Sequence, residues 1–374
     1  MSLPDRDRTC AGSDGADTVP LKTRLALTSQ PPGRSCSKKG ANLMNLSIDL
    51  SEITIVIEWE NPRDVDSKWT DLATRALADE LAREGSNARD RPTVFYLFDS
   101  QIFDEASVRD SITRSAPDLD QLASVRLIPT DGLTYYQLKN QGVALATTPY
   151  VVLLDSDVSP QPGWLAGLMR PFEDSKIMAA SGVTSLEAHD LISRTMALTW
   201  IFDLPSEHEK SRGRLSLHAN NCAFRTPFFQ SNPFPNTPAY KKQCGLWMAD
   251  ITARGIGFER TPEAYCRHAP HSGISFVIWR GIQSGLDRDA KAALEGKGRL
   301  ARLTYALWVI GKKSWRSTER ILTHRREVNL PTYQIPGALV IAWTYCFALA
   351  SAQALSAIFD GVPKSFRLRW TERT

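Results

Sequence analysis

The chain has 374 residues, enough to bury a sizeable core in one large domain with appendages. Apolar residues make up 42% of it and charged residues 23%, as in an ordinary globular protein, and the net charge of +4 is too small to indicate a nucleic-acid partner. The six cysteines show no C-x-x-C spacing, which argues against a zinc site or a disulfide framework and fits a reducing compartment.

Residues 1–43 differ from the rest of the chain in composition. They are rich in Ser, Gly, Pro, Asp and Arg and have no apolar period, so we expect a disordered tail. No apolar run follows a basic start, and we therefore expect no secretory signal.

Residues 44–285 alternate between strand-like and helix-like segments. Apolar runs rich in β-formers predict strands at residues 53–57, 93–98, 125–128, 150–154 and 177–183. Helical spacing of apolar residues predicts helices at 69–83, 136–146, from 164 onward and at 246–254. This alternation predicts an α/β fold with a doubly wound, mostly parallel sheet flanked by helices.

The segment from Tyr150 to Asp157 carries the clearest chemical signal. Its apolar run predicts a strand buried on both faces, which ends at Asp155-Ser156-Asp157. Open α/β sheets place their ligands at the carboxyl ends of strands. Two carboxylates there repel each other, and a divalent cation with substrate phosphates in its shell removes that cost. A solvated turn is the simpler explanation of an isolated D-x-D pair.

The residues on both sides extend this pattern. Lys139-Asn140-Gln141-Gly142 lies in the helix-like segment before the strand, and Pro162, Trp164 and Leu165 follow the acidic pair. The run resembles the nucleotide-sugar-binding region of the family 2 glycosyltransferases of GT-A fold. The resemblance covers about residues 50–272. It implies transfer of a sugar, with inversion, from a nucleoside diphosphate sugar to an acceptor that is lipid-linked or part of a polysaccharide.

The resemblance also implies roles for individual residues. Asp155 and Asp157 would hold Mn²⁺ or Mg²⁺ against the donor diphosphate, and His268 would add a third metal or diphosphate contact. Substrate contacts are expected from Glu58, Asn61, Asp99, Lys139, Asn140, Asp155, Asn220 and Asn221, with His271 and Arg280 as weaker diphosphate candidates. Helix capping is the alternative for Glu58 and Asp99, and a structural role is the alternative for His268.

One element departs from the family pattern. The family has a Glu-Asp pair about eleven residues before a Gly, and one of these acids acts as general base towards the acceptor. Counting back from Gly255, that place holds Gln243 and Cys244. Gln243 therefore only marks the usual position of the base, and Asp250, two turns along the helix, is a weaker candidate.

Two explanations of this departure, and one rival function of the chain, stay open. The acceptor could already be acidic, such as a phosphate or a carboxylate. The chain could be a non-catalytic nucleotide-sugar-binding scaffold. It could also be a nucleotidyltransferase, although no Gly-rich basic loop follows Ile57, where that class would normally show one.

The C-terminal region changes in character. Residues 286–330 predict a basic amphipathic helical linker, with a short apolar helix at 300–310 and a basic run from Lys312 to Arg326. Residues 331–374 contain one continuous run of 24 residues without a charge, 336–359. A helix of this length can cross a hydrocarbon core of about 30 Å. Trp343, Tyr345 and the preceding basic run favour a membrane segment over a buried helix, with the catalytic domain facing the cytoplasm. A segment lying in the membrane interface is an open alternative.

Overall fold

The computed structural model describes residues 49–63, 65–87, 89–237, 242–271 and 273–359. The predicted N-terminal tail, residues 1–43, lies outside these ranges, as do residues 360–374 of the predicted C-terminal region.

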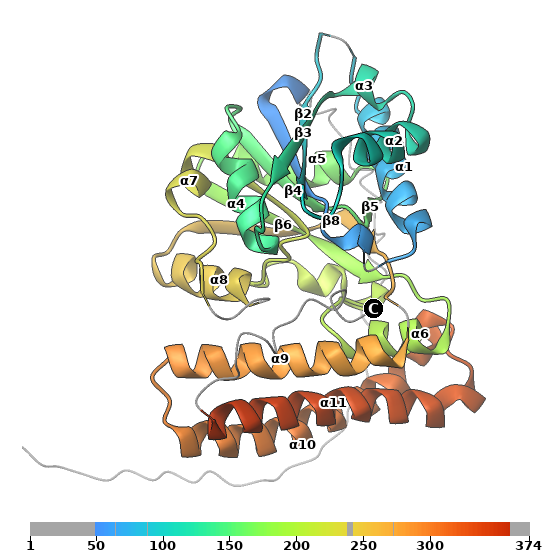
Figure 1. The fold of residues 1–374 in the computed structure, drawn as a ribbon, viewed down its shortest axis with the longest axis vertical. Coiled ribbons are helices and arrows are strands. Elements are labelled where there is room, and N and C mark those ends of the chain that lie inside the picture. The colour runs from blue at the N-terminus through green and yellow to red at the C-terminus, as the bar shows by residue number, and fades with distance from the viewer. Residues whose placement is uncertain (1–48, 64, 88, 238–241, 272, 360–374) are drawn as a thin grey trace, which may run out of the picture. The chain divides into compact units, whose positions relative to one another are not determined.

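Among the described residues, eight strands form one mixed sheet in the order β3-β2-β1-β4-β7-β6-β8-β5 (Figure 1). The strands are β1 (Ile53–Glu58), β2 (Thr93–Asp99), β3 (Ser124–Thr130), β4 (Tyr150–Asp155), β5 (Val158–Pro160), β6 (Ile177–Leu186), β7 (Asn221–Arg225) and β8 (Gly257–His268). Strands β3, β2, β1 and β4 run parallel, as predicted. Beyond β4 the sheet is mixed, because β7 runs antiparallel to both β4 and β6, and β5 runs antiparallel to β8.

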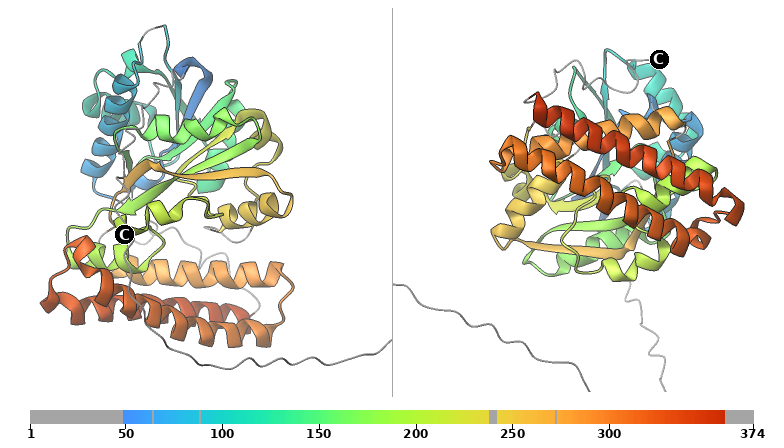
Figure 2. Two further views of the ribbon diagram at one scale, coloured as in Figure 1. Left: turned by 180° about the vertical axis from the view of Figure 1, so that it is seen from behind. Right: turned by 90° about the horizontal axis from the view of Figure 1, so that it is seen from below.

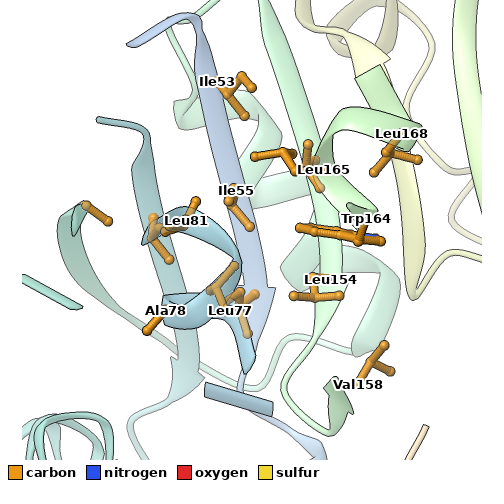
Figure 3. Packing of buried hydrophobic residues seen from close by; sticks show 14 of the residues in the cluster. Ile53, Ile55, Leu77, Ala78, Leu81, Leu154, Val158, Trp164, Leu165 and Leu168 are labelled. Atoms are coloured by element: carbon orange, nitrogen blue, oxygen red, sulfur yellow. The ribbon is translucent and has the colours of Figure 1, made fainter. Parts of the chain in front are cut away.

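Helices cover both faces of the parallel half, which explains its uninterrupted apolar strands. The helices on one face are α1 (Ser67–Arg83), α2 (Glu105–Ser115), α3 (Leu119–Leu122) and α5 (Trp164–Met169). Those on the other are α4 (Tyr135–Leu145), α7 (Thr226–Ser231) and α8 (Gln243–Ala253). Figure 3 shows Ile55 of β1 near Leu81 of α1 and Leu165 of α5. Its neighbour Val56 packs on the opposite face, as the two-residue period of a strand requires.

Four further helices pack together beside the carboxyl ends of the parallel strands (Figures 1 and 2). They are α6 (Leu191–Thr199), α9 (Ile274–Leu294), α10 (Arg299–His324) and α11 (Ile335–Ile358). Helices α9 and α11 approach closely at Gly281 and Gly285, where an added Cβ would collide with the backbone of Tyr345 and Leu349 respectively.

The C-terminal boundaries differ from those predicted. The predicted domain end at residue 285 falls inside α9, and the short helix predicted at 300–310 continues through the basic run as α10. Residues 286–330 therefore complete two packed helices in the structure, in place of a linker. The reason is that the basic residues share α10 with the apolar residues that pack on α6 and α11.

A buried carboxylate on α1 connects this helix to the turn after the acidic pair. Glu80 is only 1% exposed, and its carboxylate accepts hydrogen bonds from the backbone N–H groups of Gly163 (3.1 Å) and Leu165 (3.0 Å). Arg83 pairs with the same carboxylate at 2.8 Å. Because the first N–H groups of a helix have no acceptor within that helix, Glu80 caps α5 from outside and fixes the turn near Asp157.

Replacing Glu80 by Gln should destabilise the protein by about 1–3 kcal/mol, because an NH₂ group would then face a buried N–H donor. Urea denaturation measures this free energy. The neighbouring exposed residue provides the control, since Asp79→Asn should change stability by less than about 0.5 kcal/mol. Equal effects of the two substitutions would contradict the capping role of Glu80.

Candidate active site

The carboxyl ends of β1 and β4 meet at the centre of the sheet and carry acidic side chains. The two strands pair so that Glu58 lies opposite Asp155, and both carboxyl groups are buried. Lys139 of α4, also fully buried, places Nζ 2.6 Å from Oδ1 of Asp155. Tyr135, one turn earlier on α4, donates its hydroxyl to the same carboxylate at 3.0 Å. Helix α4 thus supplies both partners of Asp155 from one face.

Carboxyl groups outnumber basic groups at these strand ends, where Glu58, Asp155 and Asp157 meet Lys139. Burial, together with the nearby Asp155, raises the pKa of Glu58 well above its usual value. Burial also raises the pKa of Asp157, while His268 opposes the shift. Burial alone would lower the pKa of Lys139, but the carboxylates of Asp155 and Glu58 raise it. Lys139 therefore stays charged and balances one acid, which leaves the cluster suited to a further cation.

Asp157, His268 and His271 bring three possible metal-ligand atoms within 4.8 Å of one another. Strand β5, directly after Asp157, pairs with β8 so that Val158 lies opposite His268. Oδ1 of Asp157 accepts a hydrogen bond from Asn61 at 2.9 Å, whereas its buried Oδ2 has no hydrogen-bond partner among the described residues. An orphaned carboxylate oxygen beside two imidazoles fits a divalent cation.

The hydrogen bonds of His268 orient it as a metal ligand. Its Nδ1 lies 2.7 Å from the carbonyl oxygen of Ala269, which can only accept, so Nδ1 carries the proton. Nδ1 also lies 3.7 Å from Oδ2 of Asp157. In the neutral ring Nε2 keeps a lone pair that a metal could use, as in many metal-binding histidines. The predicted metal site is thus divided: Asp157 and His268 lie in the cluster, and Asp155 is held by Lys139 and Tyr135.

A cavity of about 340 Å³ lies over these groups, between the sheet and the C-terminal helices. Asn61, Asp155 and His268 line it from the sheet. The opposite wall comes from the α6–β7 connection and from α9, α10 and α11, with polar groups at His218, Asn220, Arg280, Asp287, Arg288 and Lys313. The active-site cavity therefore needs the C-terminal helices as well as the sheet.

Several predicted substrate ligands lie outside the lining of this cavity. Asp99 is buried at the end of β2 and accepts a hydrogen bond from the backbone N–H of Gln101 at 3.0 Å. It is not the cap of α2 either, because Asp104 takes that position. The side-chain amide of Asn140 donates a hydrogen bond to the carbonyl oxygen of Phe234 and accepts one from its N–H group.

The two adjacent amides of β7 differ in role. Asn220 lines the cavity, as expected of a substrate ligand. Asn221 is fully buried, accepts from the Trp164 indole at 2.8 Å and donates to the carbonyls of Val183 and Ala264. Its amide holds β6, β8 and α5 together, which does not fit the predicted substrate contact.

The predicted base positions on α8 do not present a carboxylate to the cavity. Gln243 is buried at the first residue of α8, and Asp250 is exposed and paired with Arg254 at 2.8 Å. Asp250 is absent from the cavity lining, because its side chain is exposed. Besides Asp155, the acid that lines the cavity is Asp287 of α9, to which Gln283 donates at 3.0 Å.

Sequence reasoning missed Tyr135, His218 and Asp287. Tyr135 had a usable signal, since it lies four residues before Lys139 on one helix face. His218 lines the cavity, its Nδ1 has no hydrogen-bond partner among the described residues, and burial with the nearby Arg260 and His268 lowers its pKa to about 3. Its imidazole is therefore neutral at physiological pH.

Comparison with known proteins agrees with this geometry. Residues 102–230, which contain the acidic pair, match the family model described as Glycosyl transferase family 2. These residues are similar to the family 2 glycosyl transferases, and the match covers less than half of the chain. Two Pre-mycofactocin glycosyltransferases of Mycobacterium tuberculosis (strains CDC 1551 / Oshkosh and ATCC 25618 / H37Rv) are 40% identical over 68 residues, which is 18% of this chain. The match spans 14% of the length of each of these relatives.

One solved structure resembles most of the chain in fold. The mannosyltransferase PcManGT from Pyrobaculum calidifontis, in complex with GDP-Man and Mn²⁺, superimposes with a TM-score of 0.50 at 16% identity and covers 83% of this chain and 87% of that one. GalNAc-T7 with UDP, GalNAc and Mn²⁺ gives a TM-score of 0.40 at 12% identity over 59% of this chain and 44% of that one. The first of these likenesses supports the GT-A fold.

Replacing Lys139 by Met should destabilise the domain by about 3–5 kcal/mol, because Asp155 and Glu58 would stay buried without their cation. Urea denaturation at neutral pH measures the loss. Lys176→Met removes an exposed lysine and should cost less than about 0.5 kcal/mol. A loss below about 1 kcal/mol for Lys139→Met would contradict its charge-balancing role.

Proposed function

We propose that this protein transfers a sugar from a nucleoside diphosphate sugar to an acceptor, using a divalent cation at Asp157, His268 and His271. The observation that carries the proposal is the buried Oδ2 of Asp157, which accepts no hydrogen bond from the described residues and lies beside two histidines. Asp157 lies in the region that is similar to family 2 glycosyl transferases. The names of the relatives support it, since the curated ones are glycosyltransferases and the Pyrobaculum calidifontis protein is a mannosyltransferase bound to GDP-Man and Mn²⁺.

The ligand set favours Mn²⁺ over Mg²⁺, because Mg²⁺ prefers oxygen ligands alone and this site offers two imidazole nitrogens. When bound, the cation neutralises charge on the departing diphosphate. Asn61 donates to both Glu58 and Asp157, at 2.9 Å in each case, and so fixes the Asp157 carboxylate in place.

Other residues suit the remainder of the donor. Asp155 lines the cavity and is held by Lys139 and Tyr135, so it can accept hydrogen bonds from sugar hydroxyls in a fixed orientation. The guanidinium of Arg280 lies 5.1 Å from the Trp200 ring, and its Nε and Nη1 have no hydrogen-bond partner among the described residues. Arg280 is therefore available to a diphosphate oxygen.

Asp287 is the carboxylate suited to accept a proton from an acceptor hydroxyl. It lines the same cavity as Asp155, and it does so together with Cys244, which follows Gln243 at the usual position of the base. His218 is a poorer choice, because an imidazole with a pKa of about 3 is a weak base. Direct attack by the acceptor, without a covalent enzyme intermediate, inverts the anomeric carbon.

The full-length chain should release nucleoside diphosphate from one of a panel of nucleoside diphosphate sugars when Mn²⁺ is present. Asp157→Asn and His268→Gln should each weaken Mn²⁺ binding, followed by its electron paramagnetic resonance signal, by about 10- to 100-fold. His189→Gln, at a half-exposed histidine paired with Asp190, is the control and should bind Mn²⁺ normally. Donor binding without turnover would favour a scaffold, and release of pyrophosphate would favour a nucleotidyltransferase.

The same assay tests the proton acceptor. Asp287→Asn should lower turnover by roughly 100-fold or more while leaving donor and Mn²⁺ affinity unchanged. Asp250→Asn removes an exposed carboxylate and should have no effect. Loss of activity in the Asp250 variant alone would reverse the assignment.

Residues 332–358 form a helix that is long and apolar enough to cross a membrane, but 44% of its apolar window is buried within the protein. We infer that α11 lies on the membrane surface, because its other face packs closely on Gly281 and Gly285 of α9. Helices α10 and α11 run side by side along one face (Figure 2). Helices α10 and α11 both expose large apolar side chains: Leu307, Trp308, Trp315, Leu322, Val340, Trp343 and Phe347.

Charge on α10 suits the same orientation. Lys312, Arg325 and Arg326 lie on or just after this helix and would meet anionic head groups while the aromatic side chains enter the interface. The cytoplasmic orientation of the catalytic domain rests on the basic run before the apolar helix and stays a prediction.

The double substitution Trp315→Ser with Phe347→Ser should weaken binding to anionic phosphatidylglycerol vesicles by about tenfold or more in a sedimentation assay. Leu72→Ser, at an exposed leucine of α1, is the control and should bind normally. Alkaline carbonate should release the wild-type protein from membranes, because α11 does not cross the bilayer. Retention after carbonate treatment would show a spanning helix.

A further inference from the structure

A second cavity, of about 420 Å³, lies beside the first and is lined by cationic side chains. It shares Trp200, Phe202, His218, Arg288 and Lys313 with the active-site cavity. Its wall carries six basic residues, Arg214, Arg260, Arg288, Lys313, Arg316 and Arg320. The proposed donor machinery uses none of them.

Acidic side chains balance only part of this charge. Asp203 pairs with Arg260 and, at 3.4 Å, with Arg214. Glu207 pairs with Arg320 at 3.0 Å.

Three cations remain without such a partner. Among the ion pairs of the described residues, Arg288, Lys313 and Arg316 have no carboxylate, and the buried Nε of Arg288 has no hydrogen-bond partner. The ammonium of Lys313 lies 5.1 Å from the Tyr345 ring, which offers a π face in place of a carboxylate. The cavity therefore holds about three uncompensated positive charges, which suits a multiply charged anion better than a single carboxylate.

The neighbouring cations affect the pKa of Lys313. Burial lowers its pKa to about 8, and the charges of Arg288, Arg316 and Arg320 act in the same direction. An anion bound between these side chains would relieve both the repulsion and the loss of hydration.

The position of the cavity separates it from the donor site. His268 and His271 of the metal-ligand cluster line the first cavity, as does Arg280. Neither the three ligands of the cluster nor Arg280 lines the second. Helix α10 contributes Lys313, Arg316, Ser317 and Arg320 to the second cavity, and the same helix carries the exposed apolar side chains assigned to the membrane surface. A ligand held here would reach the active site from the side of α10.

We propose that this second cavity, defined by Arg288, Lys313 and Arg316, binds the acceptor substrate through a phosphate or diphosphate ester. The name acceptor rests on the proposed function, whereas the phosphate-binding chemistry rests on the side chains of the cavity. An acceptor of this kind could be a soluble phosphate ester or a lipid phosphate, since both present the same group.

Calorimetric titration of the full-length chain with ethyl phosphate, dodecyl phosphate and pyrophosphate, without metal and at fixed ionic strength, tests this. Lys313→Gln and Arg316→Gln should each weaken binding by about tenfold or more, the usual effect of losing one charge-assisted contact. Lys176→Gln is the control, because Lys176 is exposed and lines neither cavity. No loss in the two cavity variants, or an equal loss in Lys176→Gln, would overturn the proposal.

Two further comparisons complete the test. Tighter binding of dodecyl phosphate than of ethyl phosphate would indicate a lipid source, and equal affinity a soluble one; both support the phosphate site. Mn²⁺-dependent donor turnover with unchanged phosphate affinity in the variants would overturn this inference and leave the proposed function standing. Selective loss of phosphate binding in a protein that turns over no donor would leave the site standing and overturn the proposed function.

Discussion

The buried ion pair between Lys139 and Asp155 is the interaction on which the candidate site depends. It allows an acidic strand end to be buried at the centre of a sheet, where an unpaired carboxylate would carry a large desolvation penalty. Lys139 and Tyr135 hold Asp155, whereas Oδ2 of Asp157 accepts no hydrogen bond within the described part of the chain. The two carboxylates of one short motif therefore have different tasks, one fixed by the protein and one suited to a cation.

The C-terminal helices complete the site that the sheet begins. Helix α8 lacks an acid facing the cavity, and α9 contributes Asp287 to the lining instead. The same helix carries Arg280 and Arg288, and α10 adds Lys313. Donor, acceptor and membrane would thus meet along one set of packed helices, so that a change in the packing of α9 on α11 would alter all three.

The local pattern of apolar residues was sufficient to predict the strands and helices of the parallel half of the sheet. The strands at 53–57, 93–98 and 150–154 and the helix at 69–83 were predicted to within a few residues, because both faces of these strands and one face of the helix are buried. The antiparallel placement of β7 between β4 and β6 was not predicted, since a short apolar strand carries no information about its direction. Glu80 is a similar case: its spacing from Ala73 and Leu77 puts it on the buried face of α1, but its partners lie far along the chain.

By itself, the sequence determined the α/β class, the order of the first strands and helices, and the acidic pair at the end of a buried strand. Hydrophobic periodicity and a short motif are local properties, so they can be recognised in the sequence without knowledge of the fold. Only the tertiary structure decided that Asp155 pairs with Lys139, that Asp157 joins His268 and His271, that Asn140 and Asn221 bind backbone groups, and that Asp250 faces outward. These assignments depend on which distant side chains reach the same point in space, and that is set by strand register and helix packing.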